Sequence, residues 1–277
     1  MSAKLPKQLF WIIFVVIAAV VFLLITKDNK KATGSSASVK DNRYVLKFSD
    51  NFKKGLATED NLGLSILLAV DCSGSMYDMP KDGSSRYAKY ILASQSLYEI
   101  VSFLESFYND NLKKDGTILK IGIIKFDNEV SNIFDLREMN ERNFEELKKI
   151  TSESYNFMPR GSTAIGKALE RGAEVLSQSQ TIFKSLILIT DGENTDNPKP
   201  EKVLSAIVED RNNKSTEDFP IFTNSILVSF VGFDIGSYIF EDLAKIGSRI
   251  TSASNKIELI DSLKKIFLAD ITKLEAK

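Results

Sequence analysis

Residues 67–76 read LLAVDCSGSM, an apolar run that ends in an acidic residue followed by two spaced hydroxyls. The run extends back to Leu64 without a charged residue, which is typical of a strand buried on both faces of a parallel sheet. Asp71, Ser73 and Ser75 then follow at every second position. A carboxylate and two alcohols at the end of a buried strand indicate a polar site at the edge of the sheet.

Similar apolar, β-branched runs recur along the chain and predict the strands of one sheet: 64–70, 118–126, 185–190 and 225–233. Residues 130–136 predict an antiparallel edge strand, and 248–253 predict a last strand. Between these runs, apolar residues spaced by three and four predict helices, including a closing amphipathic helix over 257–271. The fold class is therefore α/β: an open, doubly wound, mostly parallel sheet with one antiparallel edge strand and helices on both faces.

The N-terminal part has a different character. Residues 9–25, LFWIIFVVIAAVVFLLI, are an unbroken run of 17 apolar residues. As a helix this run is about 26 Å long, enough to span a bilayer core with help from its ends. The alternative is a cleaved signal peptide, but the run is long for one and no small-residue cleavage pattern follows it directly. We expect one transmembrane anchor over 9–26, with the domain behind it outside the cytoplasm.

Changes in composition divide the rest of the chain into further segments. A short tail, 1–8, precedes the anchor, and 27–59 form a linker whose first part is polar and small, as in a flexible tether. Within the linker, RYVLKFS at 43–49 predicts a short strand. One domain follows, over 60–275.

Composition excludes several classes of function. The chain has no histidine, so a Ser-His or Cys-His nucleophile pair and a histidine-ligated zinc or haem are excluded. Lys and Arg number 36 against 37 Asp and Glu, and this balance does not indicate nucleic-acid binding. Cys72 is the single cysteine, which excludes an internal disulfide. Without a base, it is better interpreted as a small packed residue than as a nucleophile.

Polar residues also follow other predicted strands. TDGENTD places Asp191 after the strand at 185–190, and MPRGSTAIGKAL places Thr163 just before a predicted helix. Ligands of open parallel sheets bind beyond the carboxyl ends of the strands, so these residues are expected at the edge that carries Asp71, near the surface. Oxygen ligands select Mg²⁺, Ca²⁺ or Mn²⁺ over zinc or copper. The alternative is a set of polar loops that solvate the edge without a metal.

In this combination the sequence resembles the von Willebrand factor type A domains. Their metal-ion-dependent adhesion site has the pattern D-x-S-x-S, then a threonine, then an aspartate followed by glycine. The resemblance covers about residues 60–275, with Gly161-Ser162 where the family usually has Gly-Gly. The matching positions are Asp71, Ser73, Ser75, Thr163 and Asp191.

The resemblance implies a Rossmann-like fold and a bound divalent cation, with Mg²⁺ as the first choice and Mn²⁺ or Ca²⁺ as alternatives. It also implies that Ser73, Ser75 and Thr163 ligate through hydroxyls while the two aspartates act largely through bound waters. A cation held by neutral hydroxyls keeps affinity for one more anionic oxygen, which an Asp or Glu of a partner protein would supply. Glu193 is a candidate accessory ligand, although a solvated loop acid is the simpler interpretation.

The predicted function is therefore a membrane-anchored module that binds a protein partner through its metal, in adhesion or in complex assembly. The alternative is a metal-dependent hydrolase or phosphotransferase that uses the same cation to activate water. The chain lacks a histidine base and a phosphate-cradling glycine loop, and residue 73 of the motif is serine where aspartyl phosphotransferases have a second aspartate. We therefore expect no enzymatic activity.

Overall fold

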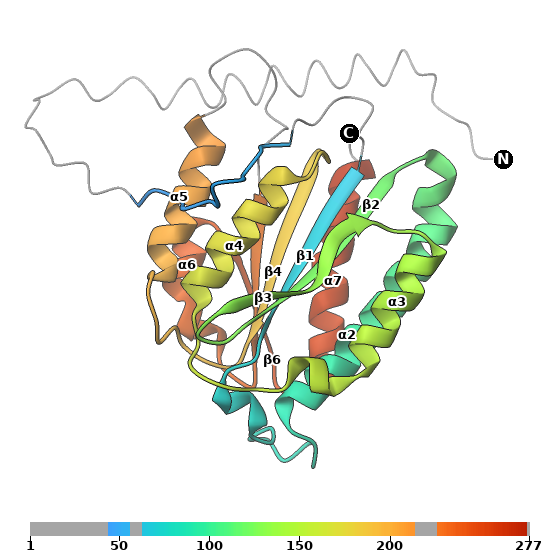
Figure 1. Cartoon of the computed structure of the whole chain (residues 1–277). Coiled ribbons are helices and arrows are strands. Elements are labelled where there is room, and N and C mark those ends of the chain that lie inside the picture. The colour runs from blue at the N-terminus through green and yellow to red at the C-terminus, as the bar shows by residue number, and fades with distance from the viewer. Residues whose placement is uncertain (1–43, 56–62, 214–225, 276–277) are drawn as a thin grey trace, which may run out of the picture. The chain divides into compact units, whose positions relative to one another are not determined.

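The computed structural model describes residues 44–55, 63–213 and 226–275 (Figure 1). The predicted anchor over 9–26 and much of the predicted linker lie outside these residues. Within the described ranges, no helix is both long enough and apolar enough to cross a membrane.

Six strands form one sheet in the order β3-β2-β1-β4-β5-β6 (Figure 1). Neighbouring strands are parallel except for β2 and β3, which pair antiparallel at one edge. This arrangement confirms the predicted sheet and its antiparallel edge strand. The strands are β1 (Gly63–Asp71), β2 (Ile118–Phe126), β3 (Val130–Glu138), β4 (Phe183–Thr190), β5 (Ile226–Phe233) and β6 (Arg249–Ala253).

The helices fall in the intervals that the apolar spacing predicted. One short helix, α6, was not predicted, because six residues are too few to show a helical period. Short turns of helix mark the loops: η2 (Gly74–Tyr77), η3 (Tyr108–Leu112), η4 (Lys113–Asp115), η5 (Ser154–Phe157) and η6 (Ser237–Phe240). The α-helices are α2 (Lys89–Phe107), α3 (Glu141–Ser152), α4 (Ile165–Gln178), α5 (Pro200–Asn213), α6 (Glu241–Ile246) and α7 (Lys256–Glu275).

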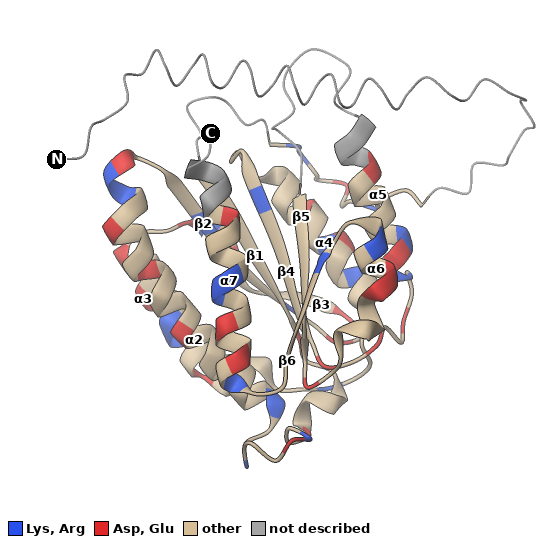
Figure 2. Cartoon of the chain, turned by 180° about the vertical axis from the view of Figure 1, so that it is seen from behind, with Lys and Arg blue, Asp and Glu red and all other residues tan. Residues whose placement is uncertain are grey.

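The central strand β1 is buried along its whole length, which explains its unbroken apolar sequence. Its alternate residues enter two different cores. Ile66 and Leu68 pack with α2, α3 and α7, whereas Leu67 and Ala69 pack with α4, α5 and α6. Figure 1 shows these two groups of helices on either side of the sheet, and Figure 2 shows the charged residues mainly on helices and loops.

The prediction of a short strand over 43–49 is wrong, because residues 44–49 form no strand. This segment lies against α4 instead of pairing with the sheet. The backbone N–H of Lys47 donates to Glu170 Oε1 at 2.6 Å, and that of Ser49 donates to Glu174 Oε1 at 2.8 Å. Carboxylates on a helix thus accept the backbone hydrogen bonds that a neighbouring strand would accept if this segment were part of the sheet.

The strand order places a switch point between β1 and β4. The chain leaves β1 to build β2 and β3 on one side, then returns to build β4, β5 and β6 on the other. Connections that leave in opposite directions open a crevice at the carboxyl ends of the two central strands, where doubly wound folds bind ligands. Asp71 ends β1 and Asp191 directly follows β4, so both lie at this switch point.

Candidate metal centre

Asp71 is the innermost residue of the site. It is fully buried, with 0% of its surface exposed, so the expectation that the strand end lies at the surface is wrong. Its Oδ1 accepts a hydrogen bond from Ser73 N at 2.7 Å, and its Oδ2 accepts one from Thr190 Oγ1 at 2.5 Å. Burial, with a smaller contribution from the charge of the nearby Asp191, raises the pKa of Asp71 to about 7 despite these hydrogen bonds. A cation at this position would favour the charged form of the carboxyl group.

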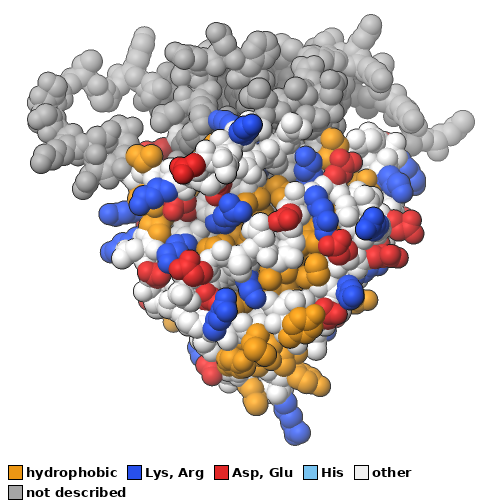
Figure 3. All heavy atoms as spheres, in the orientation of Figure 1, with side chains coloured by type: hydrophobic (Ala, Val, Ile, Leu, Met, Phe, Trp, Pro, Cys, Tyr) orange, Lys and Arg blue, Asp and Glu red, His pale blue; other side chains and the backbone are white. Residues whose placement is uncertain are grey.

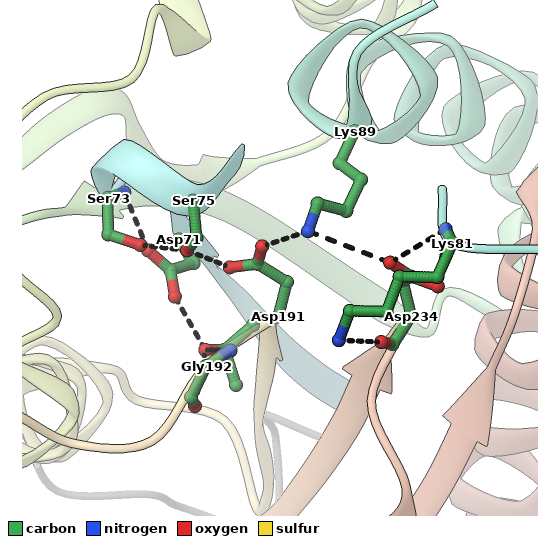
Figure 4. A network of polar contacts seen from close by, with 9 residues as sticks. Asp71, Ser73, Ser75, Lys81, Lys89, Asp191, Gly192 and Asp234 are labelled. Carbon is green, nitrogen blue, oxygen red and sulfur yellow. Dashed lines mark hydrogen bonds and ion pairs between the residues drawn. The ribbon is translucent and has the colours of Figure 1, made fainter. Parts of the chain in front are cut away.

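The two serines of the motif connect Asp71 to Asp191 (Figure 4). Ser73 and Ser75 have their Oγ atoms 3.2 Å apart, and Ser75 Oγ donates to Asp191 Oδ1 at 2.8 Å. The 3₁₀ turn η2 begins directly after Ser73, and this turn carries Ser75 towards the end of β4. The structure therefore brings together four of the five residues that the sequence predicted.

Thr163, the fifth residue, approaches the same place across Gly192. A Cβ atom at Gly192 would lie 3.6 Å from Thr163 Oγ1 and 3.9 Å from Ser75 Oγ, with no other contact within 4 Å. The backbone of Thr163 is held on both sides by Thr195, since Thr163 N donates to Thr195 Oγ1 at 2.9 Å and Thr195 N donates to Thr163 O at 2.9 Å. The absence of a side chain at Gly192 leaves a small space that these two hydroxyls border.

The loop before α4 is docked on the motif by backbone contacts. Gly74 N donates to Gly161 O at 3.1 Å, and Arg160 N donates to Cys72 O at 2.7 Å. The Arg160 side chain adds a 2.7 Å ion pair from Nε to Asp127 Oδ2 in the turn after β2. These contacts fix the distance between the D-x-S-x-S segment and the loop that carries the threonine.

Glu193 is not part of this cluster. Its side chain is exposed, and it borders a neighbouring hollow of about 520 Å³ together with Ile165, Lys199 and Phe240. None of the five predicted ligands lines that hollow. The position of Glu193 thus agrees with the interpretation as a solvated loop acid.

Lys89 and Asp234 complete the cluster, and sequence reasoning missed both. Lys89 Nζ lies 2.6 Å from Asp191 Oδ2 and 3.7 Å from Asp234 Oδ2, and the lysine side chain is only 3% exposed (Figure 4). Asp234 follows β5, so the rule that ligands bind beyond the carboxyl ends of strands could have identified it. Lys89 carries no such signal, because a lysine in the first turn of a helix is ordinarily solvated.

The donor set fits a hard cation. Within the described ranges, no group of three or more His, Cys, Asp or Glu side chains could hold a metal. A cation would therefore depend on the hydroxyls together with the two aspartates, which is a donor set of oxygens alone. Cys72 offers no thiolate ligand, because it is buried and burial raises the pKa of its thiol to about 12.

Comparison with known proteins agrees with this fold. The family model of the von Willebrand factor type A domain matches residues 65–267. No curated protein matches the chain.

Several solved structures are similar in fold. The PilB minor pilin from Streptococcus sanguinis is 13% identical with a TM-score of 0.58, over 79% of this chain and 63% of the pilin chain. The pilus adhesin SpaC from Lactobacillus rhamnosus GG is 15% identical with a TM-score of 0.56, over 80% of this chain and 32% of the adhesin. An aerotolerance-related membrane protein from Bacteroides fragilis, with multiple mutations to serine, is 16% identical with a TM-score of 0.51, over 76% of this chain and 99% of the membrane protein's chain. At these identities the likeness is one of fold.

Proposed function

This chain belongs to the von Willebrand factor type A domain family, and we propose that it is a binding module that engages a protein partner through a divalent cation. The observation that carries the proposal is the convergence of three hydroxyls and two buried carboxylates at the β1–β4 switch point. The proposed ligands, direct or through water, are Asp71, Ser73, Ser75, Thr163 and Asp191.

The cation that we propose is Mg²⁺, with Mn²⁺ and Ca²⁺ as ions that the same oxygens would accept. The hydroxyl ligands are neutral, and one of the two aspartates, Asp191, already shares its charge with Lys89. A divalent cation in this setting remains under-neutralised. A carboxylate oxygen from an Asp or Glu of the partner would then bind it with the strength of a charge-assisted contact.

The surface around the site supports a protein partner. Figure 3 shows apolar side chains gathered at the end of the molecule where the loop after β1 lies. Tyr77 and Met79 in that loop are 51% and 59% exposed, and Tyr155 and Met158 before α4 are 64% and 50% exposed. Tyrosine and methionine are both enriched in protein interfaces, and tyrosine buries a large area at low entropic cost. We propose that this apolar rim surrounds the metal-bound carboxylate of the partner.

The test of this function uses the full-length chain in detergent, with a candidate partner captured from native membranes. Retention should require Mg²⁺, should be lost on chelation, and should be lost with Thr163→Ala. Ser102→Ala removes a half-buried hydroxyl on α2 that donates to Tyr98 O in the same helix, and it should leave retention unchanged. The captured partner should in turn lose binding when one of its own Asp or Glu residues is changed to Asn or Gln. Equal retention with Mg²⁺, with chelator and with Thr163→Ala would contradict the metal-bridged mechanism.

We also propose that residues 9–26 anchor the chain in a membrane as a single span, with the domain on the non-cytoplasmic side. The support is the apolar run of the sequence, together with fold relatives named as a pilus adhesin and as a membrane protein. Protease added to intact cells or spheroplasts should digest the domain while a cytoplasmic control protein stays intact. Protection of the domain until lysis would overturn the orientation.

The role that fits best is adhesion or the assembly of a membrane complex, without catalysis. A hydrolase or phosphotransferase would need a base or nucleophile beside the cation. The thiol of Cys72 cannot serve, because its pKa of about 12 keeps it protonated at neutral pH. Lys89 Nζ contacts two carboxylates, those of Asp191 and Asp234, so it is engaged in ion pairs and not free to act on a water beside the cation.

A further inference from the structure

Lys89 occupies an unfavourable place for a cation. It is the first residue of α2, where the helix dipole disfavours positive charge, and the N-cap residue, Ala88, makes no side-chain capping hydrogen bond. The lysine side chain is 3% exposed, so it has also lost most of its hydration. A buried ammonium at a helix N-terminus requires a specific compensating charge, and the structure supplies it from two directions.

The compensating charges are the carboxylates of Asp191 and Asp234. The ion pair with Asp191 is short, 2.6 Å, and that with Asp234 is 3.7 Å. Asp234 is itself fixed from the other side, because the backbone N–H of Lys81 donates to both of its carboxylate oxygens at 3.1 and 3.2 Å. The network thus joins the loop after β1, the start of α2 and the ends of β4 and β5 (Figure 4).

The two oxygens of Asp191 have different partners. Oδ1 accepts from Ser75, which is a proposed metal ligand, while Oδ2 contacts Lys89. A divalent cation bound at the hydroxyls and the ammonium of Lys89 would therefore act on opposite sides of one carboxylate. Two positive charges on either side of one carboxylate repel each other, and they also compete for the negative charge of Asp191.

We propose that Lys89 is a built-in counter-ion that limits the affinity of the site for its divalent cation. This inference rests on the proposed function, because it takes the cation to bind at the five residues named above. The ammonium neutralises Asp191 when no metal is bound, which keeps the domain stable in the metal-free state. It also makes tight binding of the metal depend on a further negative charge. A partner carboxylate supplies that charge, so metal and partner bind cooperatively, each raising the affinity of the other.

The test compares Mg²⁺ binding by calorimetry and thermal unfolding for the full-length chain in detergent. Lys89→Met keeps the length of the side chain and removes its charge. We expect its Mg²⁺ affinity to rise by about ten-fold or more, because the repulsion is gone and Asp191 is fully available. Its unfolding temperature without metal should fall, and Mg²⁺ should raise that temperature more than in the wild type. Lys184→Met removes another buried lysine, at the start of β4, and should leave the Mg²⁺ affinity unchanged.

A second variant acts in the opposite direction. Asp234→Asn removes one of the two charges that share Lys89, so the ammonium is committed more fully to Asp191, and Mg²⁺ affinity should fall several-fold. This variant keeps an oxygen for the Lys81 backbone and serves as the deciding measurement if Lys89→Met does not fold.

The outcomes separate this inference from the function beneath it. If the wild type binds Mg²⁺ and Lys89→Met binds it equally or more weakly, the counter-ion role is overturned while the metal site stands. An unchanged or higher affinity in Asp234→Asn would overturn it as well. If neither the wild type nor Lys89→Met binds Mg²⁺, the proposed function fails. Binding by Lys89→Met alone would support the inference in its strongest form.

Discussion

Asp71→Asn should abolish Mg²⁺ binding, with a loss of affinity of about a hundred-fold or more, and should leave the fold intact. The variant removes the negative charge closest to the end of β1, and a carboxylate within several ångströms of a divalent cation contributes strongly at the low effective dielectric of a buried site. Calorimetric titration of the full-length chain with Mg²⁺ measures the effect.

Asparagine is the informative substitution because of the surroundings of Asp71. Its oxygen can still accept the hydrogen bond from Ser73 N, and Thr190 Oγ1 already has a second acceptor, Gly192 O, at 3.2 Å. Alanine would instead leave the buried N–H of Ser73 without its acceptor, which costs about 1–3 kcal/mol. We therefore expect the unfolding temperature of Asp71→Asn without metal to equal or exceed that of the wild type.

Asp270→Asn provides the matched control. Asp270 is also buried, at 1% exposure, but it lies on α7, where it accepts from Ser185 and pairs with Arg249. This variant should lower stability and leave the Mg²⁺ affinity unchanged. If Asp71→Asn retains the wild-type affinity for Mg²⁺, the assignment of the site to the end of β1 is wrong.

Gly166→Ala should destabilise the protein by about 4 kcal/mol, at the upper end of what single substitutions do. In a helix interior this change ordinarily stabilises by about 0.5–1 kcal/mol, so the predicted sign is opposite to that of helix propensity. The reason is a steric clash with the loop after β4. A Cβ atom at Gly166, in the first turn of α4, would lie 1.8 Å from the backbone oxygen of Pro198. Chemical denaturation measures the loss.

The same substitution should weaken Mg²⁺ binding, because the segment it displaces supports the site. Gly166 N donates to Asn194 Oδ1 at 3.3 Å, and the neighbouring Thr195 holds both backbone groups of Thr163. Gly172→Ala in the same helix is the control, since the atoms nearest to its new Cβ would be the methyl groups at the end of the Leu186 side chain, at 2.6 Å. That side chain can move, so the loss should be smaller. A Gly166→Ala protein as stable as the wild type would show that this loop yields without cost.

Local pattern was sufficient to predict most of the fold and the five residues of the site. Strands buried on both faces leave unbroken apolar runs, and β1, β2, β4 and β5 were located from such runs. The parallel arrangement then places the carboxyl ends of the strands at one edge. The D-x-S-x-S segment and Asp191 could therefore be expected together, although Ser75 and Asp191 lie 116 positions apart in the chain. Whether these five residues bind a metal stays a prediction.

Only the tertiary structure revealed which charges compensate one another. The pairing of Lys89 with Asp191 and Asp234 joins segments that are far apart in sequence, and no periodicity of α2 marks its first residue as buried. Residues 44–49 likewise have the composition of a strand, but their backbone donors are satisfied by two carboxylates on α4. Buried apolar residues recur along a helix or strand at a regular spacing, so they can be predicted from a short stretch of sequence. An ion pair is a single contact through space, so its partners are determined only once the strands have taken their order in the sheet.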